Sequence, residues 1–148
     1  TPKPSSAASD VYKRQIQEDG PEENQGKGRQ MLAAAATKIA RQLKVPGMLV
    51  ITRKGRGATK MANLRVRGIP IFAFTESEKT ISTLMLLRGV YPYLLKFDED
   101  PELTIQNALK LLKKKQDMPS GISIVVVADI MTGEGYVNCL QIRTLPED

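Results

Sequence analysis

The sequence predicts an α/β fold: an open three-layer αβα arrangement in which five strands form one mostly parallel sheet. Short apolar runs bounded by turn residues, typical of strands buried on both faces, alternate with segments of helical periodicity. The last two strands are joined by about eight residues, too few for a crossover helix, so we expect the final strand to be antiparallel. The 148 residues suffice for one domain with a sizeable core.

The first expected helix spans about residues 31–43. Its apolar residues recur at three- and four-residue steps, and we expect them to face the core: Met31, Leu32, Ala35, Ile39 and Leu43. Four consecutive alanines also favour a helix here. Pro46-Gly47 then ends it.

Strands and helices alternate through the rest of the chain. In order, we expect a strand at 48–51, a helix from Gly55 to about Arg65, a strand at 71–74, a helix from Thr75 to Arg88, a strand at 91–95, a helix from Pro101 to Lys115, and strands at 122–128 and 136–144. Thr75 and Glu78 have the spacing of a capping box, and Gly89 suits the residue after the same helix. The alternation in the last strand indicates a half-exposed edge strand.

The first 24 residues differ from the rest in composition. They are rich in Pro, Ser, Gln, Asp, Glu and Gly, and their isolated apolar residues fit no period. Such a segment buries too little surface to offset the entropy lost on ordering. We therefore expect residues 1–24 to be disordered or non-native, and residues 25–148 to form the α/β domain.

The charge distribution indicates an anionic partner. The chain carries a net charge of +6, and the stretch from Met31 to Thr75 holds nine basic residues and no acidic one. One cysteine and no histidine exclude disulfide frameworks, Cys/His zinc sites and histidine-based triads within this sequence. No apolar run approaches the roughly 20 residues of a membrane span.

The best candidate for an anion site follows the first buried strand. In open α/β sheets, ligands bind beyond the carboxyl ends of strands, where the amides and dipole of the next helix attract phosphate. The residues at this position are Thr52, Arg53, Lys54, Gly55, Arg56 and Gly57. They match neither a Walker A loop nor the dinucleotide-binding motif. The alternative is a solvated turn whose basic residues only increase solubility.

Two further segments reach the same edge of the predicted sheet. Residues 74–77 are better interpreted as a helix cap. The second segment is a predicted flexible loop, with residues that could close over a ligand: Asp129, Thr132, Gly133, Glu134 and Gly135. An ordinary hairpin connection is the alternative, and its two carboxylates would be unfavourable beside a phosphate. Asp129 and Glu134 could also form an acid–base pair or a magnesium site, but their spacing in a loop is a weak signal for either. Cys139 is better interpreted as a core thiol.

Several segments resemble the C-terminal domain of pyruvate kinase. In order they are residues 34–40, 48–57, 69–75, 87–92, 124–127, 133–138 and 140–143. The resemblance covers about Gln30 to Leu145, and its more specific pieces are Arg88-Gly89-Val90-Tyr91-Pro92 and the strand Ile71–Thr75. The Phe-Ala-Phe-Thr and Leu-Gln-Ile-Arg-Thr segments look most similar to plant or algal plastid members.

The resemblance implies a five-stranded sheet with an antiparallel last strand. For the full-length enzyme it implies phosphoryl transfer from phosphoenolpyruvate to ADP with magnesium and potassium, assembly as a homotetramer, and a cytoplasmic or plastid location. The family's catalytic residues lie in its barrel domain, which nothing in this sequence matches, so none is carried over. We expect this chain alone to be an inactive regulatory and assembly domain that needs no cofactor.

In regulated relatives this domain binds sugar phosphates, and the phosphate loop falls on residues 52–57. Gly57 replaces the final serine or threonine of that loop. The arginine that receives a second phosphate aligns near Thr104, and the effector-loop Trp-Arg pair becomes Ile130-Met131. The resemblance therefore implies a phosphorylated metabolite with one phosphate group, such as a sugar monophosphate. The alternative remains a non-enzymatic basic domain that binds nucleic acid or an acidic protein, although no nucleic-acid motif is present.

Overall fold

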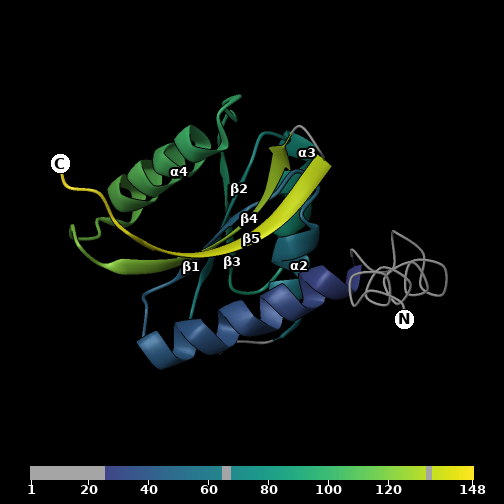
Figure 1. Ribbon diagram of the computed structural model, residues 1–148, viewed down its shortest axis with the longest axis horizontal. Coiled ribbons are helices and arrows are strands. Elements are labelled where there is room, and N and C mark those ends of the chain that lie inside the picture. The colour runs from purple at the N-terminus through teal and green to yellow at the C-terminus, as the bar shows by residue number, and fades with distance from the viewer. Residues whose placement is uncertain (1–25, 65–67, 133–134) are drawn as a thin grey trace, which may run out of the picture.

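The computed structural model describes residues 26–64, 68–132 and 135–148 (Figure 1). Residues 26–43 are helical. The elements that follow are β1 (Met48–Ile51), α2 (Arg56–Asn63), β2 (Ile71–Thr75), α3 (Glu78–Leu84), β3 (Val90–Leu94), α4 (Pro101–Gln116), β4 (Ser123–Thr132) and β5 (Gly135–Thr144). The expectation of disorder over residues 1–24 lies outside the described residues. None of the described helices is long and apolar enough to cross a membrane.

The five strands form one sheet in the order β3-β2-β1-β4-β5. β1 pairs in parallel with β2 and β4, β2 pairs in parallel with β3, and β4 pairs antiparallel with β5. The predicted fold class is therefore confirmed, including the antiparallel edge strand. β1 is central, and all four of its residues are buried.

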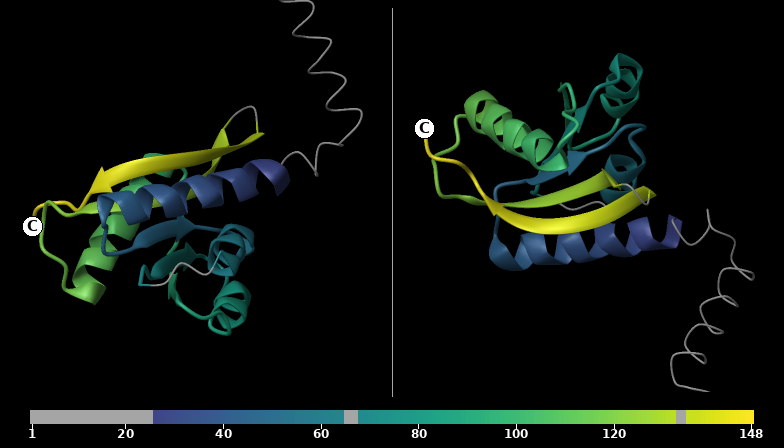
Figure 2. Two further views of the ribbon diagram at one scale, coloured as in Figure 1. Left: turned by 90° about the horizontal axis from the view of Figure 1, so that it is seen from below. Right: turned by 45° about the horizontal axis from the view of Figure 1, so that its top comes forward.

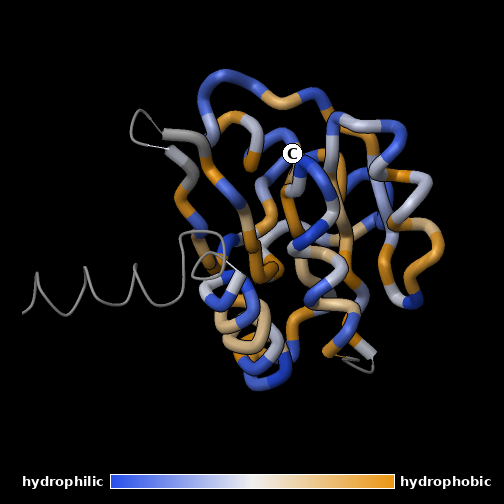
Figure 3. Tube along the Cα trace, turned by 90° about the vertical axis from the view of Figure 1, so that its right-hand side faces the viewer, coloured by the Kyte–Doolittle hydropathy of each residue, from blue (hydrophilic) through white to orange (hydrophobic). Residues whose placement is uncertain are grey.

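Helices cover both faces of the sheet, as the views in Figure 2 show. The N-terminal helix, α2 and α3 pack on one face, where they share a core with Met48, Val50 and Ile71. α4 covers the opposite face and packs on Leu49, Phe74 and other strand residues. Hydrophobic segments follow the strands in Figure 3, and the outer loops are mostly hydrophilic.

The buried face of the N-terminal helix differs from the prediction. Ala33, Ala36 and Ala40 are buried, whereas Met31 is 73% exposed and Leu43 is 50% exposed. The expectation that these apolar residues face the core was therefore wrong at Met31 and Leu43, and also at Ala35, which is exposed. Small alanine side chains let the helix approach the sheet closely, a possibility that a periodicity built on larger residues overlooks.

α3 begins and ends at residues other than those predicted. Its N-cap is Ser77, whose hydroxyl accepts a hydrogen bond from the Thr80 amide at 3.2 Å. Thr75 is the last residue of β2 and pairs with Leu94, so it cannot cap the helix. The helix ends at Leu84, and turns rather than helix continue toward β3. The expectation of a capping box at Thr75 and a helix up to Arg88 was therefore wrong.

The segment predicted as a flexible loop is mostly β-hairpin. β4 continues past Ala128 to Thr132, and Asp129 pairs with Asn138 and Thr132 with Gly135. Ile130 packs against the core beneath α4, and this burial extends the strand. The prediction of a loop from 129 to 135 was therefore wrong. Gly133 and Glu134 lie outside the described residues.

A bidentate ion pair fastens the edge strand to α4. The Arg143 guanidinium donates to both carboxylate oxygens of Glu102, at 3.0 and 2.5 Å. Hydrogen bonds from Arg143, and then from Gln106, lower the pKa of Glu102 from 4.5 to about 2. The pair joins the first turn of α4 to the end of β5.

We predict that Glu102→Gln lowers the free energy of unfolding at pH 7 by at most about 1 kcal/mol, because the pair is solvent-exposed. A carboxyl group whose pKa is lowered by folding stabilises the protein at pH values above the pKa of the unfolded chain. That contribution is lost as the pH falls from about 4.5 toward about 2. The difference between wild type and variant should therefore shrink over this range. Urea unfolding at pH 6, 4 and 3 measures it, and a pH-independent difference would contradict the assignment.

Candidate functional site

The chain leaves β1 through a tight turn that glycine makes possible. The Gly55 amide donates a hydrogen bond to the buried Thr52 hydroxyl at 2.8 Å. Gly55 has φ +82°, and a Cβ there would lie 3.1 Å from Leu84 Cδ2 and 3.3 Å from Thr80 Cγ2. Both the backbone conformation and the close approach of α3 therefore require glycine.

A second set of hydrogen bonds ties this turn to the neighbouring strand and helix. The Arg53 carbonyl accepts from the Thr80 hydroxyl of α3 at 3.0 Å and from the Thr75 hydroxyl of β2 at 3.4 Å. The turn is thus held from within and from two other elements. Its backbone is fixed before any ligand arrives.

The first turn of α2 follows immediately and is open to an anion. No side chain caps it, and it contains no acidic residue. α3 and α4, by contrast, are capped by Ser77 and Asp100. Uncapped amides at a helix N-terminus, with the positive end of its dipole, form a typical phosphate site. We call residues 52–57 the cradle, in which Arg56 and Gly57 contribute these amides; the next residue, Ala58, is fully buried.

The cradle contains three cationic residues. The side chains of Arg53, Lys54 and Arg56 are exposed, and all three belong to the turn or the start of α2. The Arg53 guanidinium lies 5.7 Å from the centroid of the Phe97 ring, which orients it toward the start of α4. The six residues predicted as a phosphate site form one turn at the start of α2, in which Arg53, Lys54 and Arg56 are exposed and Thr52 and Gly55 are buried.

A cavity of about 260 Å³ adjoins the cradle between the carboxyl ends of β1 and β4. Apolar residues such as Ile51, Ile105 and Ala128 line it, together with Arg53 and Phe97. β2 and β4 lie on opposite sides of β1, so the chain connections diverge here. Such a switch point is the usual ligand position in an open α/β sheet.

The described residues of the predicted effector loop lie at different distances from the cradle along the β4–β5 hairpin. Asp129 directly follows Ala128, the partner of Ile51, and lines the cavity with Arg53. Thr132 and Gly135 pair with each other three steps farther along. Gly133 and Glu134 are not among the described residues. Only Asp129 is therefore shown beside the cradle.

Three residues near the site escaped the sequence reasoning. Phe97 follows β3 at the same edge of the sheet, so its position was a usable signal. Thr80 supports the turn from α3, and Arg29 of the N-terminal helix lies 3.6 Å from the Asp129 carboxylate. No local pattern marks these last two, because each acts on a residue far away in the sequence.

The weak catalytic candidates gain no support from the geometry. Cys139 is half-buried in β5, and burial is the largest of the causes that raise the pKa of its thiol. A raised pKa lowers the thiolate fraction and hence the reactivity. Among residues 26–64, 68–132 and 135–148, no group of three or more acidic or cysteine side chains could hold a metal ion.

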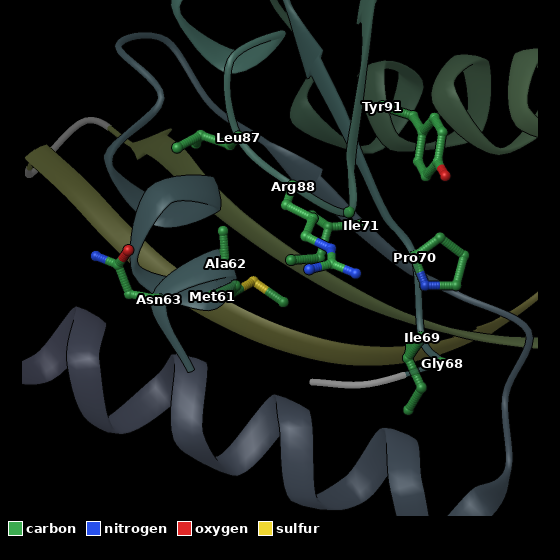
Figure 4. Close-up of a pocket in the computed structure, with 11 residues that line it drawn as sticks. Met61, Ala62, Asn63, Gly68, Ile69, Pro70, Ile71, Leu87, Arg88 and Tyr91 are labelled. Carbon is green, nitrogen blue, oxygen red and sulfur yellow. The ribbon is translucent and has the colours of Figure 1, made fainter. Parts of the chain in front are cut away.

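A larger cavity, of about 1030 Å³, lies at the opposite edge of the sheet (Figure 4). It is lined by residues at the ends of α2 and α3 and before β2 and β3, with the Arg88 guanidinium beside Met61 and Ile71. The carboxyl-terminal ends of both helices lie there, and their negative poles disfavour anions. The smaller cavity is therefore the better candidate for a phosphate compound.

Comparison with known proteins agrees with this architecture. The family described as "Pyruvate kinase, alpha/beta domain" matches residues 30–143. A chloroplastic pyruvate kinase isozyme A of Nicotiana tabacum is 33% identical over 104 residues, which are 70% of this chain and 17% of the relative. A pyruvate kinase of Eimeria tenella is 34% identical over 75% of this chain and 21% of its own length.

The fold is also similar to solved structures. Cryptosporidium parvum pyruvate kinase in complex with ADP superposes with a TM-score of 0.72 and 26% identity, over 80% of this chain and 24% of that chain. A second structure of the same enzyme gives a TM-score of 0.68 at 25% identity, over 80% of this chain and 22% of that chain. The chain therefore spans about a fifth of the length of these relatives.

Proposed function

The chain belongs to the family of the pyruvate kinase α/β domain, and we propose that it serves as the regulatory and assembly domain of a pyruvate kinase. In this proposal it binds a phosphorylated metabolite in the cradle. The observation that carries the proposal is the uncapped start of α2 beside three exposed cations. A dianionic phosphate would satisfy the open amides and offset the positive charge.

The cavity beside the cradle favours a ligand with one phosphate group. Arg53 is the one cationic residue among those lining it, whereas the acidic residues Asp98 and Glu99 also line it. A second phosphate in this cavity would meet these carboxylates, and the repulsion would be costly away from bulk water. A neutral sugar has hydroxyl groups that can donate hydrogen bonds to the same carboxylates. We therefore propose a sugar monophosphate.

The activity of the whole enzyme is proposed from kinship alone. The transfer of phosphate from phosphoenolpyruvate to ADP would take place outside this chain, which we propose to be inactive by itself. The described residues offer no ligand set for the magnesium that the family resemblance implies. We assign that metal, and potassium, to the full-length enzyme. Relatives named as chloroplastic favour a plastid over a cytoplasmic location.

The free edge of β5 supports assembly into a homo-oligomer. β5 is an edge strand of ten residues, and its Val137 and Ile142 side chains are 48% and 56% exposed. A long edge strand with exposed apolar side chains favours pairing with another chain. We propose that a tetramer of the full-length enzyme uses such contacts.

We predict that Arg53→Ala and Arg56→Ala each weaken binding of a hexose 6-phosphate about tenfold to a hundredfold, because a hydrogen bond to a charged group contributes about 1.5–3 kcal/mol. Isothermal titration calorimetry measures the change. Lys114→Ala, at the exposed end of α4, is the control with the same change in net charge, and it should bind like wild type. Equal affinity of all four proteins would remove the cradle as the site.

Gly57→Ser should tighten binding of the same phosphate, by about threefold to tenfold for a hydroxyl donor restored at the start of α2. A Cβ at Gly57 meets Val50 Cγ1 at 3.6 Å, an ordinary contact, so the position accepts a side chain. Gly57→Ala is the matched control, because it adds the Cβ and the helix propensity without the hydroxyl. Calorimetry separates the two variants, and equal affinities would show that no phosphate oxygen comes within reach of this position.

A further inference from the structure

The Asp129 carboxylate points to the side of the sheet where α2 and the N-terminal helix lie. Its predecessor, Ala128, pairs with Ile51, and both side chains pack in the core beneath α4. Side chains alternate along a strand, so Asp129 faces away from α4. Asp129 is the residue after Ala128 in β4, and Thr52 is the residue after Ile51 in β1. Asp129 is therefore level with Thr52, the first residue of the cradle.

An unbalanced carboxylate at this position would oppose phosphate binding. Asp129 lies level with Thr52 in the adjacent strand, and its side chain is only 27% exposed. Partial burial reduces screening by water, so a negative charge here acts strongly on a neighbouring anion. The cradle therefore needs a compensating positive charge close to Asp129.

Arg29 of the N-terminal helix supplies that charge. Its guanidinium lies 3.6 Å from the Asp129 carboxylate, and its side chain is only 19% exposed. The Arg29 Nε is buried and has no hydrogen-bond partner among the described residues. This ion pair offsets the negative charge of Asp129 beside Thr52.

The start of the N-terminal helix is also joined to α2. The Lys60 ammonium of α2 donates a hydrogen bond to the Gly26 carbonyl at 2.7 Å. Figure 2 shows the same end of the helix beside the β4–β5 hairpin. The first helical turn thus contacts α2, whose start belongs to the cradle, through Lys60 in its last turn, and contacts β4 through Asp129.

We propose that Arg29 is a positioning residue of the cradle, and that phosphate binding and docking of the N-terminal helix favour each other. The inference rests on the proposed function. With Arg29 in place, Asp129 is neutralised and a phosphate group binds; when the helix start moves away, Asp129 repels it. Linkage requires the reverse effect, so bound phosphate stabilises the docked helix.

The experiment measures binding of a hexose 6-phosphate to the whole chain by calorimetry. Arg29→Ala should weaken binding about fivefold to tenfold, whereas Asp129→Asn should tighten it, because Arg29 is then unbalanced. The double variant should bind within about twofold of wild type. Arg41→Ala, an exposed arginine of the same helix, is the matched control and should change nothing.

A second readout follows the helix itself. Hydrogen exchange of the amides of residues 27–30 should slow when the ligand binds to wild type, and should respond little in Arg29→Ala. Wild-type affinity in Arg29→Ala, or weaker binding in Asp129→Asn, would overturn the inference while leaving the cradle in place. The affinity of Asp129→Asn tests the inference even if Arg29→Ala fails to fold. If wild type did not bind the ligand at all, or if Arg53→Ala and Arg56→Ala bound it as tightly as wild type, the proposed function itself would be contradicted.

Discussion

The site depends on how the chain leaves its most buried strand. β1 is hydrogen-bonded to a strand on each side and covered on both faces, so it gives the turn that follows it a fixed starting point. The hydroxyl groups of Thr52, Thr75 and Thr80 then fix that turn through backbone hydrogen bonds. The backbone of the cradle is therefore preorganised, and in the proposed function little ordering entropy would be lost when an anion binds.

The strands, and their alternation with helices, could be predicted from the sequence because burial on both faces leaves a clear signal. β1 and β2 are continuous apolar runs, and turn residues bound them. The helix faces were harder, because Ala33 and Ala36 pack closely without a large side chain to mark them. The hairpin was mistaken for a loop, since Asp129 and Thr132 are polar although they continue a paired strand.

The cradle could be predicted from local signals alone: a buried strand ends, glycines follow and a helix begins. What surrounds the cradle was not predicted. Phe97 beneath Arg53 and Arg29 against Asp129 are pairs between distant segments, and single-sequence periodicity carries no information about such pairs. These contacts add charged and aromatic groups near the cradle, so the electrostatics of this region depend on tertiary structure.

The central claim is that the amides at the start of α2 hold a phosphate group. A ¹⁵N chemical-shift titration with inorganic phosphate tests it directly, because each backbone amide reports separately. The account predicts the largest shifts at Arg56 and Gly57, with saturation at one ligand per chain. Shifts concentrated at the basic end of α4, around Lys113–Lys115, with none at the start of α2, would contradict it.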